Sequence, residues 1–311
     1  MKQEGFMAKV LNFGSLNLDI VYSLDHIVRE GETISSSHVE RYCGGKGLNQ
    51  SVALKKAGAD LYHAGAIGKE DGIILKNTLR ELGADTRFIK EYNQKSGHAV
   101  IQVSKRGENC IILYPGTNHS IQRKDMDETL SYFEAGDFLV LQNEINDMQY
   151  LMEQAYQKGL RMVLNPSPMD EKIPTYPLDY VEFFILNEIE ARDILKKESQ
   201  LSEGLIARFP DSKIVLTLGK KGVVYRDKNC SYSNCAYPVE AVDTTAAGDT
   251  FTGYFIASIA AGKAVPSALN LASVAASIAV SRKGAASSIP SLQEVLSSPY
   301  LKGERSRDEY L

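Results

Sequence analysis

Cysteine is scarce in this chain, and its few thiols form no recognisable pair. The cysteines are Cys43, Cys110, Cys230 and Cys235, with no C-x-x-C spacing among them. In a chain of 311 residues this suggests neither a disulfide framework nor a zinc site. Structural thiols in a reducing compartment are the better interpretation.

Long hydrophobic runs and a strong charge imbalance are also missing. No apolar stretch reaches the roughly 18 residues that a membrane-spanning helix needs. Residues 1–6 are polar with one glycine and lack the apolar core of a signal peptide, so we expect a cytoplasmic protein without a membrane partner. The net charge is −4, which argues against a nucleic-acid partner.

Several common catalytic motifs are absent. There is no G-x-x-x-x-G-K-[ST], so the chain is not a P-loop enzyme. The segment 45–47 reads G-K-G but has no third glycine at the spacing of a dinucleotide fingerprint. Neither a nucleophile elbow nor H-E-x-x-H occurs.

The sequence does contain a regular alternation of apolar runs and helical stretches. We expect strands at 9–14, 61–67, 138–142, 162–165, 183–186 and 214–218, and helices at 47–57, 72–82, 250–261 and 267–282. This order predicts an α/β fold with a doubly wound, mainly parallel sheet flanked by helices. No internal repeat or low-complexity linker appears, so we expect a single domain over residues 1–311.

Two regions depart from this alternation. Residues 19–42 contain two extended runs around Gly31, and residues 98–114 contain two apolar runs around a charged turn, which is a hairpin signal. Extra strands predict a small projecting sheet, with lid strands inserted within about 17–43 and 97–114. Such a sheet would act as a lid over a ligand. An ordinary antiparallel extension of the main sheet is the alternative.

A run of small residues leads into an apolar helix near residue 250. The segment 242–251 reads V-D-T-T-A-A-G-D-T-F, and free backbone N–H groups at such a helix start attract an anion. Asp249 lies in the first turn, where its carboxylate can accept a proton while the amides hold developing negative charge. That pairing suits phosphoryl transfer. The alternative is a carboxylate that only complements the helix dipole.

Polar residues also follow a glycine-rich turn and the ends of expected strands. The turn at 43–50 reads C-G-G-K-G-L-N-Q and lets the backbone approach a ligand closely. Ligands bind at the carboxyl ends of strands in an open α/β sheet. The side chains with the donors and acceptors for sugar hydroxyls are Asn17, Asp19, Lys46, Asn49 and Glu144. A purely structural turn and simple polar caps are the alternatives.

A tight glycine turn joins two apolar runs later in the chain. Residues 217–222 read T-L-G-K-K-G, between the expected strand at 214–218 and another at 223–226. A nucleotide-facing turn and an ordinary hairpin both fit this pattern, and the local residues do not decide between them.

Together these segments resemble the PfkB family of carbohydrate kinases, also called the ribokinase family, over roughly residues 9–290. Two signatures carry the resemblance, G-G-K-G-x-N-Q at 44–50 and D-T-x-A-A-G-D-T-F at 243–251. The resemblance implies a ribokinase-like fold with a β-sheet lid, and ATP-dependent phosphorylation of the primary hydroxyl of a furanose-type sugar. Lys46 and Asn49 are similar to the family's ribokinase branch, which implies D-ribose as substrate and ribose 5-phosphate as product.

Other activities fit the same resemblance. A related kinase would act on deoxyribose, fructose, 2-keto-3-deoxygluconate or a nucleoside. A protein of a different class would be a catalytically silent sugar or nucleotide sensor, against which the presence of Asp249 and Gly248 argues.

The resemblance also implies roles for individual residues. Asp249 matches the catalytic base, and Ala246, Ala247 and Gly248 match the anion hole. The residues that match sugar contacts are Asn17, Asp19, Gly45, Lys46, Asn49, Glu144 and Asp249. The residues that match the nucleotide site are Asn187, Thr217, Gly219, Gly222, Gly248 and Ser273, the last in place of a histidine that some members carry near the adenine. The residues that match metal sites are Glu190, associated with magnesium and phosphate, and Asp243, Thr245, Ala279, Arg282, Gly284 and Ser288, which match a monovalent-cation site.

The implied cofactors are ATP, Mg²⁺ and K⁺, the last as an activator. The implied partners are the sugar, ATP and a second copy of the chain paired through the lid. An unpaired apolar edge such as residues 99–103 would benefit from that covering.

Overall fold

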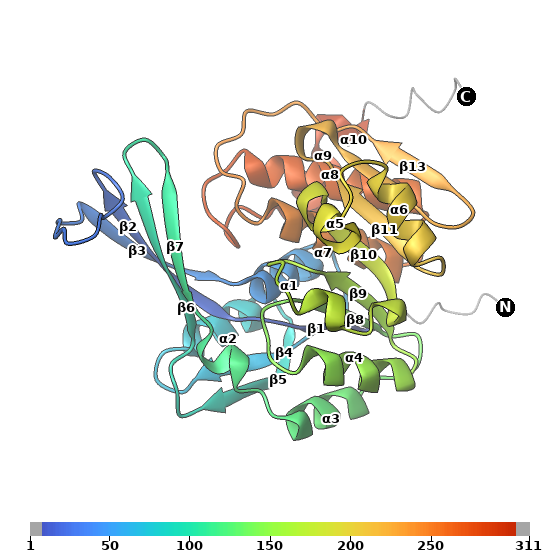
Figure 1. Cartoon of the computed structure of the whole chain (residues 1–311), viewed down its shortest axis with the longest axis horizontal. Helices are drawn as coiled ribbons and strands as arrows, with labels where there is room; N and C mark the ends of the chain where they lie inside the picture. The colour runs from blue at the N-terminus through green and yellow to red at the C-terminus, as the bar shows by residue number, and fades with distance from the viewer. Residues whose placement is uncertain (1–7, 303–311) are drawn as a thin grey trace.

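A computed structural model of the chain describes residues 8–302 (Figure 1). The segment 1–6, assessed above for a signal peptide, lies outside that range. Within it, no helix combines the length and the apolar character that a membrane span requires.

A large sheet forms the centre of the molecule, with the strand order β13-β12-β11-β10-β9-β8-β1-β4-β5. Its strands are β1 (Val10–Phe13), β4 (Leu61–Gly68), β5 (Asp85–Tyr92), β8 (Phe138–Gln142), β9 (Arg161–Asn165), β10 (Val181–Asn187), β11 (Lys213–Thr217), β12 (Val223–Arg226) and β13 (Ser231–Asn234). All pairings are parallel except those of β12 with β11 and with β13. The strand order reverses between β1 and β8, which is the switch point where such sheets bind ligands.

Helices cover both faces of this sheet. The first face carries α1 (Lys46–Lys56), α2 (Ile73–Glu81), α7 (Ala247–Ala260), α8 (Val265–Val280), α9 (Leu292–Ser297) and α10 (Pro299–Lys302), and the second carries α3 (Arg123–Ser131), α4 (Met148–Gln157), α5 (Glu188–Leu195) and α6 (Leu201–Arg208). Successive strand residues alternate between the two cores: Phe138 and Val140 join the first, Leu139 and Leu141 the second. The expected doubly wound fold is confirmed.

A second sheet projects from the main body, as Figure 1 shows. Its strands are β2 (Asn17–Leu24), β3 (His38–Gly44), β6 (Gly97–Ser104) and β7 (Asn109–Tyr114), in the order β3-β2-β6-β7. We call it the lid sheet. Strand β2 pairs parallel with β6, and the other two pairings are antiparallel. The expectation that residues 99–103 form an unpaired edge is wrong, because they lie in β6 between β2 and β7, and the edges of the lid sheet are β3 and β7.

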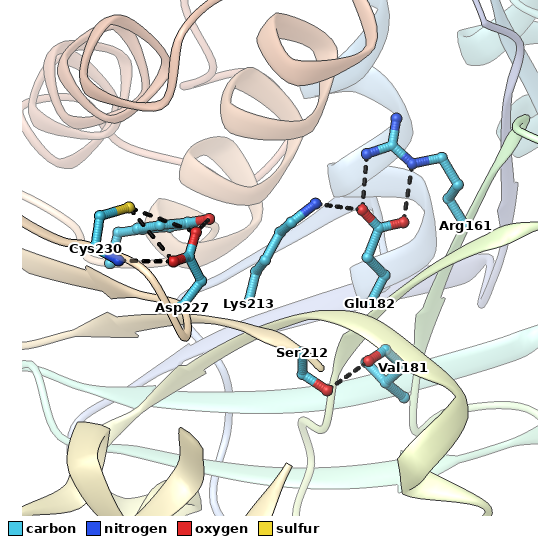
Figure 2. Close-up of polar contacts among 8 residues, drawn as sticks. Arg161, Val181, Glu182, Ser212, Lys213, Asp227 and Cys230 are labelled. Carbon is cyan, nitrogen blue, oxygen red and sulfur yellow. Dashed lines mark hydrogen bonds and ion pairs between the residues drawn. The ribbon is translucent and has the colours of Figure 1, made fainter. Parts of the chain in front are cut away.

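Polar contacts connect the amino ends of the parallel strands β9, β10 and β11, at the end of the sheet opposite the carboxyl ends of these strands. Glu182 accepts hydrogen bonds from Arg161 at 2.8 and 2.9 Å and from Lys213 at 2.5 Å (Figure 2). Ser212 Oγ donates to the carbonyl oxygen of Val181 at 2.7 Å beneath them. The hydrogen bonds and opposite charges lower the pKa of Glu182 although its burial acts the other way.

Some expected boundaries are wrong by a few residues. The helix expected at 250–261 begins at Ala247, because Ala246 adopts a left-handed conformation (φ 59°) that separates the loop from the helix. The helix expected at 267–282 spans Val265–Val280, and the strand expected at 214–218 spans Lys213–Thr217. Beyond that strand the turn at 219–222 joins β11 to β12 as an antiparallel hairpin.

Candidate active site

A cavity of about 460 Å³ opens at the carboxyl ends of the parallel strands, beneath the lid sheet. The lid sheet contributes apolar side chains to its wall: Ala99 and Ile101 from β6, Ile111 and Leu113 from β7. The rest of the wall is mainly polar and comes from the main domain and from Asn17 and Asp19, at the base of lid strand β2. This separation gives a polar floor under an apolar cover.

Neighbouring parallel strands each place a polar side chain in the cavity, at or just after the carboxyl end. These are Asn17 after β1, Glu144 after β8, Asn165 in β9, Asn187 in β10 and Thr217 in β11. Helices α1 and α7 pack against each other beside them, and their first turns complete the floor.

The cavity brings most of the predicted site residues together. Those in its wall are Asn17, Asp19, Gly45, Lys46, Asn49, Glu144, Asn187, Glu190, Thr217, Thr245, Ala246, Ala247, Gly248 and Asp249. Those outside its wall are Gly219, Gly222, Asp243, Ser273, Ala279, Arg282, Gly284 and Ser288. Ser273 is buried in α8, where its carbonyl oxygen accepts from Ser277 Oγ at 2.8 Å. The roles of all these residues stay predictions.

Asp249 lies buried in the first turn of α7 and presents a hydrogen-bonded carboxylate. Its Oδ1 accepts from Gln50 Nε2 at 2.9 Å, and its Oδ2 accepts from Asn49 Nδ2 at 3.1 Å. Burial raises the pKa of Asp249, while the charge of Lys46 and the two amide donors act to lower it. A raised pKa makes this carboxylate a better proton acceptor.

The amino end of α7 is open to an anion. No side chain caps this helix, and its N-cap Ala246 has a left-handed backbone. The first N–H groups of a helix have no partner within it, and the helix dipole favours negative charge there. Ala246, Ala247 and Gly248 line the cavity at this point, so an anion bound here lies next to Asp249.

Two further carboxylates lie at the base of the lid sheet. Burial and the nearby charge of Glu144 raise the pKa of Asp19 to about 7. Glu144 accepts hydrogen bonds from Ser15 Oγ and from the backbone N–H of Lys46, and its burial raises its own pKa. A Cβ at Gly44 would lie 2.0 Å from an Asp19 carboxylate oxygen, so a larger residue there would displace that carboxylate.

A capping box shapes the part of the cavity at the start of α5. Asn187 Oδ1 accepts from the backbone N–H of Glu190 at 3.0 Å, and Glu190 Oε2 accepts from the backbone N–H of Asn187 at 2.9 Å. Burial raises the pKa of Glu190. A carboxylate is thus fixed in the cavity wall on the side of β10 and β11.

Asp243 ties the loop before α7 to the loop after α8. Its Oδ1 accepts from Thr245, at 2.9 Å from the backbone N–H and 2.6 Å from Oγ1, and its Oδ2 accepts from the Gly284 N–H at 3.1 Å. Arg282 instead pairs with Glu294 at 2.7 Å. Ser288 is buried and donates to the Ala285 carbonyl oxygen at 2.8 Å. Within residues 8–302, no three His, Cys, Asp or Glu side chains gather as metal ligands.

Several residues of the site were not singled out from the sequence. Asn165 ends β9, and the strand-end rule that indicated Glu144 would have found it. Thr252 follows Asp249 by almost one helical turn and faces the same cavity. Gln50 stands in the glycine-rich signature without an assigned role, and its contact with Asp249 depends on a pairing of distant segments.

The fold and the site define a ribokinase-like phosphotransferase: a doubly wound sheet, a lid sheet, and a buried carboxylate beside an open helix start. A family model described as pfkB family carbohydrate kinase matches residues 7–292. The chain belongs to this family, which confirms the expected ATP-dependent carbohydrate kinase.

Individual relatives agree over almost the whole length. The chain is 33% identical over 303 residues to a ribokinase of Haemophilus influenzae, covering 93% of this chain and 98% of the relative. Ribokinase from Cryptococcus neoformans, solved with ADP, aligns with a TM-score of 0.81 at 34% identity, covering 93% and 98% of the two chains. Arabidopsis thaliana ribokinase, solved with ribose and ATP, aligns with a TM-score of 0.84 at 28% identity, covering 94% and 98%.

Proposed function

We propose that this enzyme transfers the γ-phosphoryl group of ATP to the primary hydroxyl of D-ribose, giving ribose 5-phosphate. The observation that carries the proposal is the buried Asp249 carboxylate, which shares one cavity with the open start of α7 and with Asp19, Lys46 and Glu144. The similarity to ribokinases, one of them solved with ribose and ATP, supports ribose as the sugar.

In the proposed reaction Asp249 accepts the proton of the sugar's primary hydroxyl as that oxygen attacks the γ-phosphorus in line. The N–H groups at the start of α7, around Ala247 and Gly248, hold the negative charge that develops. Asp19, Lys46 and Asn49 would bind the ring hydroxyls and fix the angle of approach. Catalysis of this kind consists mainly of positioning and charge stabilisation.

The donor set beside α5 fits Mg²⁺. Glu190 is a buried carboxylate in the cavity wall, and Mg²⁺ prefers oxygen ligands from one or two carboxylates, phosphates and water. When bound, the ion neutralises charge on the phosphate oxygens. Glu190 would hold it on the nucleotide side of the cavity, with Asn187 and Thr217 nearby along β10 and β11.

The two loops joined by Asp243 fit a monovalent cation. Its carboxylate draws Gly284 to the loop that begins α7, and backbone carbonyls of the 279–288 segment would supply the remaining oxygen ligands. A bound K⁺ adds positive field beside Ala246, Ala247 and Gly248. Asp243 and its loops would then stiffen the anion hole without contacting the substrate.

The lid sheet belongs, in this proposal, to a single domain that pairs with a second copy through β7. Every residue of β7 is exposed, including Ile111 and Ile112 at 56% and 59%. An apolar edge strand of this kind is stabilised when another strand covers it. The four free cysteines of the chain suit a reducing compartment, which supports the cytoplasm as its location.

The test of the substrate is kcat/KM for ATP-dependent phosphorylation of ribose, 2-deoxyribose, fructose, 2-keto-3-deoxygluconate and nucleosides. A site built to bind a hydroxyl leaves its own polar groups unpaired when that hydroxyl is missing, so deoxyribose should be the poorer substrate. A tenfold preference for any other of these compounds would refute ribose as the substrate without affecting the assignment as a kinase. Absence of turnover with all of them would point to the silent sensor.

The test of the base is Asp249→Asn. Loss of a general base costs on the order of 10²–10⁴-fold in kcat, while sugar and ATP should still bind in calorimetry. A variant with more than half of the wild-type kcat would remove Asp249 from this role.

A further inference from the structure

A chain of buried amide side chains, none of which lines the cavity, leads away from Asp249 through Gln50, Gln142 and Asn12. Gln50 Nε2 donates to Asp249 Oδ1 at 2.9 Å, and Gln50 Oε1 accepts from Gln142 Nε2 at 2.7 Å. Gln142 Nε2 also donates to Asn12 Oδ1 at 2.9 Å. Gln50, Gln142 and Asn12 are each 0% exposed, so a bound sugar does not contact them.

A backbone carbonyl fixes the direction of this chain at its far end. Asn12 Nδ2 donates to the Gly47 carbonyl oxygen at 2.7 Å and to Ser51 Oγ at 2.8 Å. Because a carbonyl oxygen only accepts, Asn12 must direct its Nδ2 there and its Oδ1 toward Gln142. Gln142 must then direct its Nε2 toward Asn12 Oδ1, and the same Nε2 donates to Gln50 Oε1. With its oxygen placed there, Gln50 presents an N–H group, and not a carbonyl, to Asp249.

A second carbonyl imposes the same direction independently. Asn165 Nδ2 donates to the Ile185 carbonyl oxygen at 2.9 Å, so its Oδ1 faces Gln50 and accepts from Gln50 Nε2 at 3.3 Å. Both hydrogens of the Gln50 amide are thereby used, one for Asn165 and one for Asp249. Turning this amide by 180° would set its oxygen against two acceptors.

The chain of amide side chains next to Asp249 carries no charge of its own. Ser51 Oγ, which accepts from Asn12, also shares a hydrogen bond of 2.7 Å with His63 Nδ1. Complete burial lowers the pKa of His63 to about 3, so its imidazole is neutral at physiological pH. Amide side chains are not basic, and an imidazole with so low a pKa does not hold a proton at physiological pH. These residues therefore do not relay the proton of Asp249, and their contacts orient its carboxylate.

We propose that Gln50 is a positioning residue for phosphoryl transfer, which holds one oxygen of the Asp249 carboxylate so that the carboxylate faces the sugar hydroxyl. Its own orientation comes from Gln142 and Asn165. The inference rests on the proposed role of Asp249 as the base. Asn49 holds the other oxygen from within the cavity, so Gln50 is the partner that substrate cannot displace.

Gln50→Met tests this role, because methionine has a similar length and no N–H groups. A hydrogen bond to a charged group is worth roughly 10- to 100-fold, so kcat should fall by about that factor. The KM values for sugar and ATP should stay close to wild type. Removing a donor from a carboxylate raises its pKa, so the acid limb of the pH profile of kcat should move to higher pH.

Two companion variants separate positioning from stability. Ser212→Ala removes one buried hydrogen bond at the opposite edge of the sheet (Figure 2). It should lower the melting temperature and leave the acid limb in place. Gln142→Met keeps the contact between Gln50 and Asp249 but removes one of the two partners that orient the Gln50 amide, leaving Asn165. A smaller shift of the acid limb in the same direction is therefore expected.

The outcomes distinguish this role from that of the base. If Asp249→Asn is inactive while folded Gln50→Met has the kcat and pH profile of the wild type, the Gln50 role is refuted and the base stands. If Asp249→Asn remains active, the role of Asp249 as the base and the role of Gln50 as its positioning residue are both refuted. Should Gln50→Met fail to fold, Gln142→Met decides: an unmoved acid limb overturns the proposal, and a limb displaced to higher pH supports it.

Discussion

The two helices that carry the site cross so closely that glycine is required at the contact. A Cβ added to Gly253 of α7 would lie 2.3 Å from the Cβ of Ala53 in α1 and 2.7 Å from the backbone nitrogen of Leu54. Carbon atoms pack at about 3.5–4.0 Å. An alanine at this position therefore forces α1 and α7 apart by about an ångström.

We expect Gly253→Ala to lower kcat by about 10²-fold, the effect of an ångström of misplacement at a reacting centre. Asp249 lies on α7 and its two amide partners on α1, at 2.9 and 3.1 Å. Separation of the helices lengthens both bonds beyond the usual limit of about 3.2 Å. Overpacking costs roughly 1–3 kcal/mol and the better helix propensity of alanine returns about 1 kcal/mol, so the net loss of stability is about 0–2 kcal/mol.

The assay measures kcat from ADP release, with urea unfolding alongside. Gly204→Ala in α6 is the matched control, because a Cβ there meets only the flexible end of the Leu195 side chain at 2.8 Å. It should keep the wild-type kcat and a stability equal to or above that of the wild type. A Gly253→Ala enzyme that turns over at the normal rate would refute the link between helix spacing and the Asp249 carboxylate.

The carboxylates and the lid give three more expectations. The pKa of Asp19 is about 7 in the folded protein against 3.8 for a free carboxyl. The native state therefore binds more protons than the unfolded state between these pH values, and the free energy of unfolding falls as pH rises. In urea unfolding, Asp19→Asn should lack this contribution to the pH dependence. Potassium should stimulate turnover through the Asp243 loops, and equal rates in a bulky organic cation would contradict this. Ile112→Lys on β7 should give a monomer in sedimentation, and an unchanged mass would exclude pairing through the lid.

The central sheet could be predicted because its buried strands are continuous apolar runs. Strand β8 matches its expected span residue for residue, since Phe138–Gln142 is buried on both faces. Strand β5 was not predicted, because Asp85–Tyr92 lies at the sheet edge and intersperses charges among its few buried positions. Strand β13, Ser231–Asn234, was not predicted either, because it is short and largely exposed and so has no apolar run.

The site was predictable where local rules apply and not where distant segments meet. Asn17 and Glu144 follow strand ends, and the start of α7 is visible in its small residues. The role of Gln50 depends on Gln142, which is 92 residues away in the sequence. Hydrogen-bond direction in that chain is decided by backbone carbonyls whose positions only the folded structure defines.

Strand β2 has a consequence for how the enzyme responds to its own concentration. It begins at Asn17 in the cavity wall and runs without interruption to Leu24 in the lid sheet, so a movement of the lid sheet also moves Asn17 and Asp19. Pairing of two lids through β7 would favour one pose, and sugar would favour one as well. By mass action such equilibria are linked and reciprocal, so apparent sugar affinity would vary with enzyme concentration around the dimerisation constant.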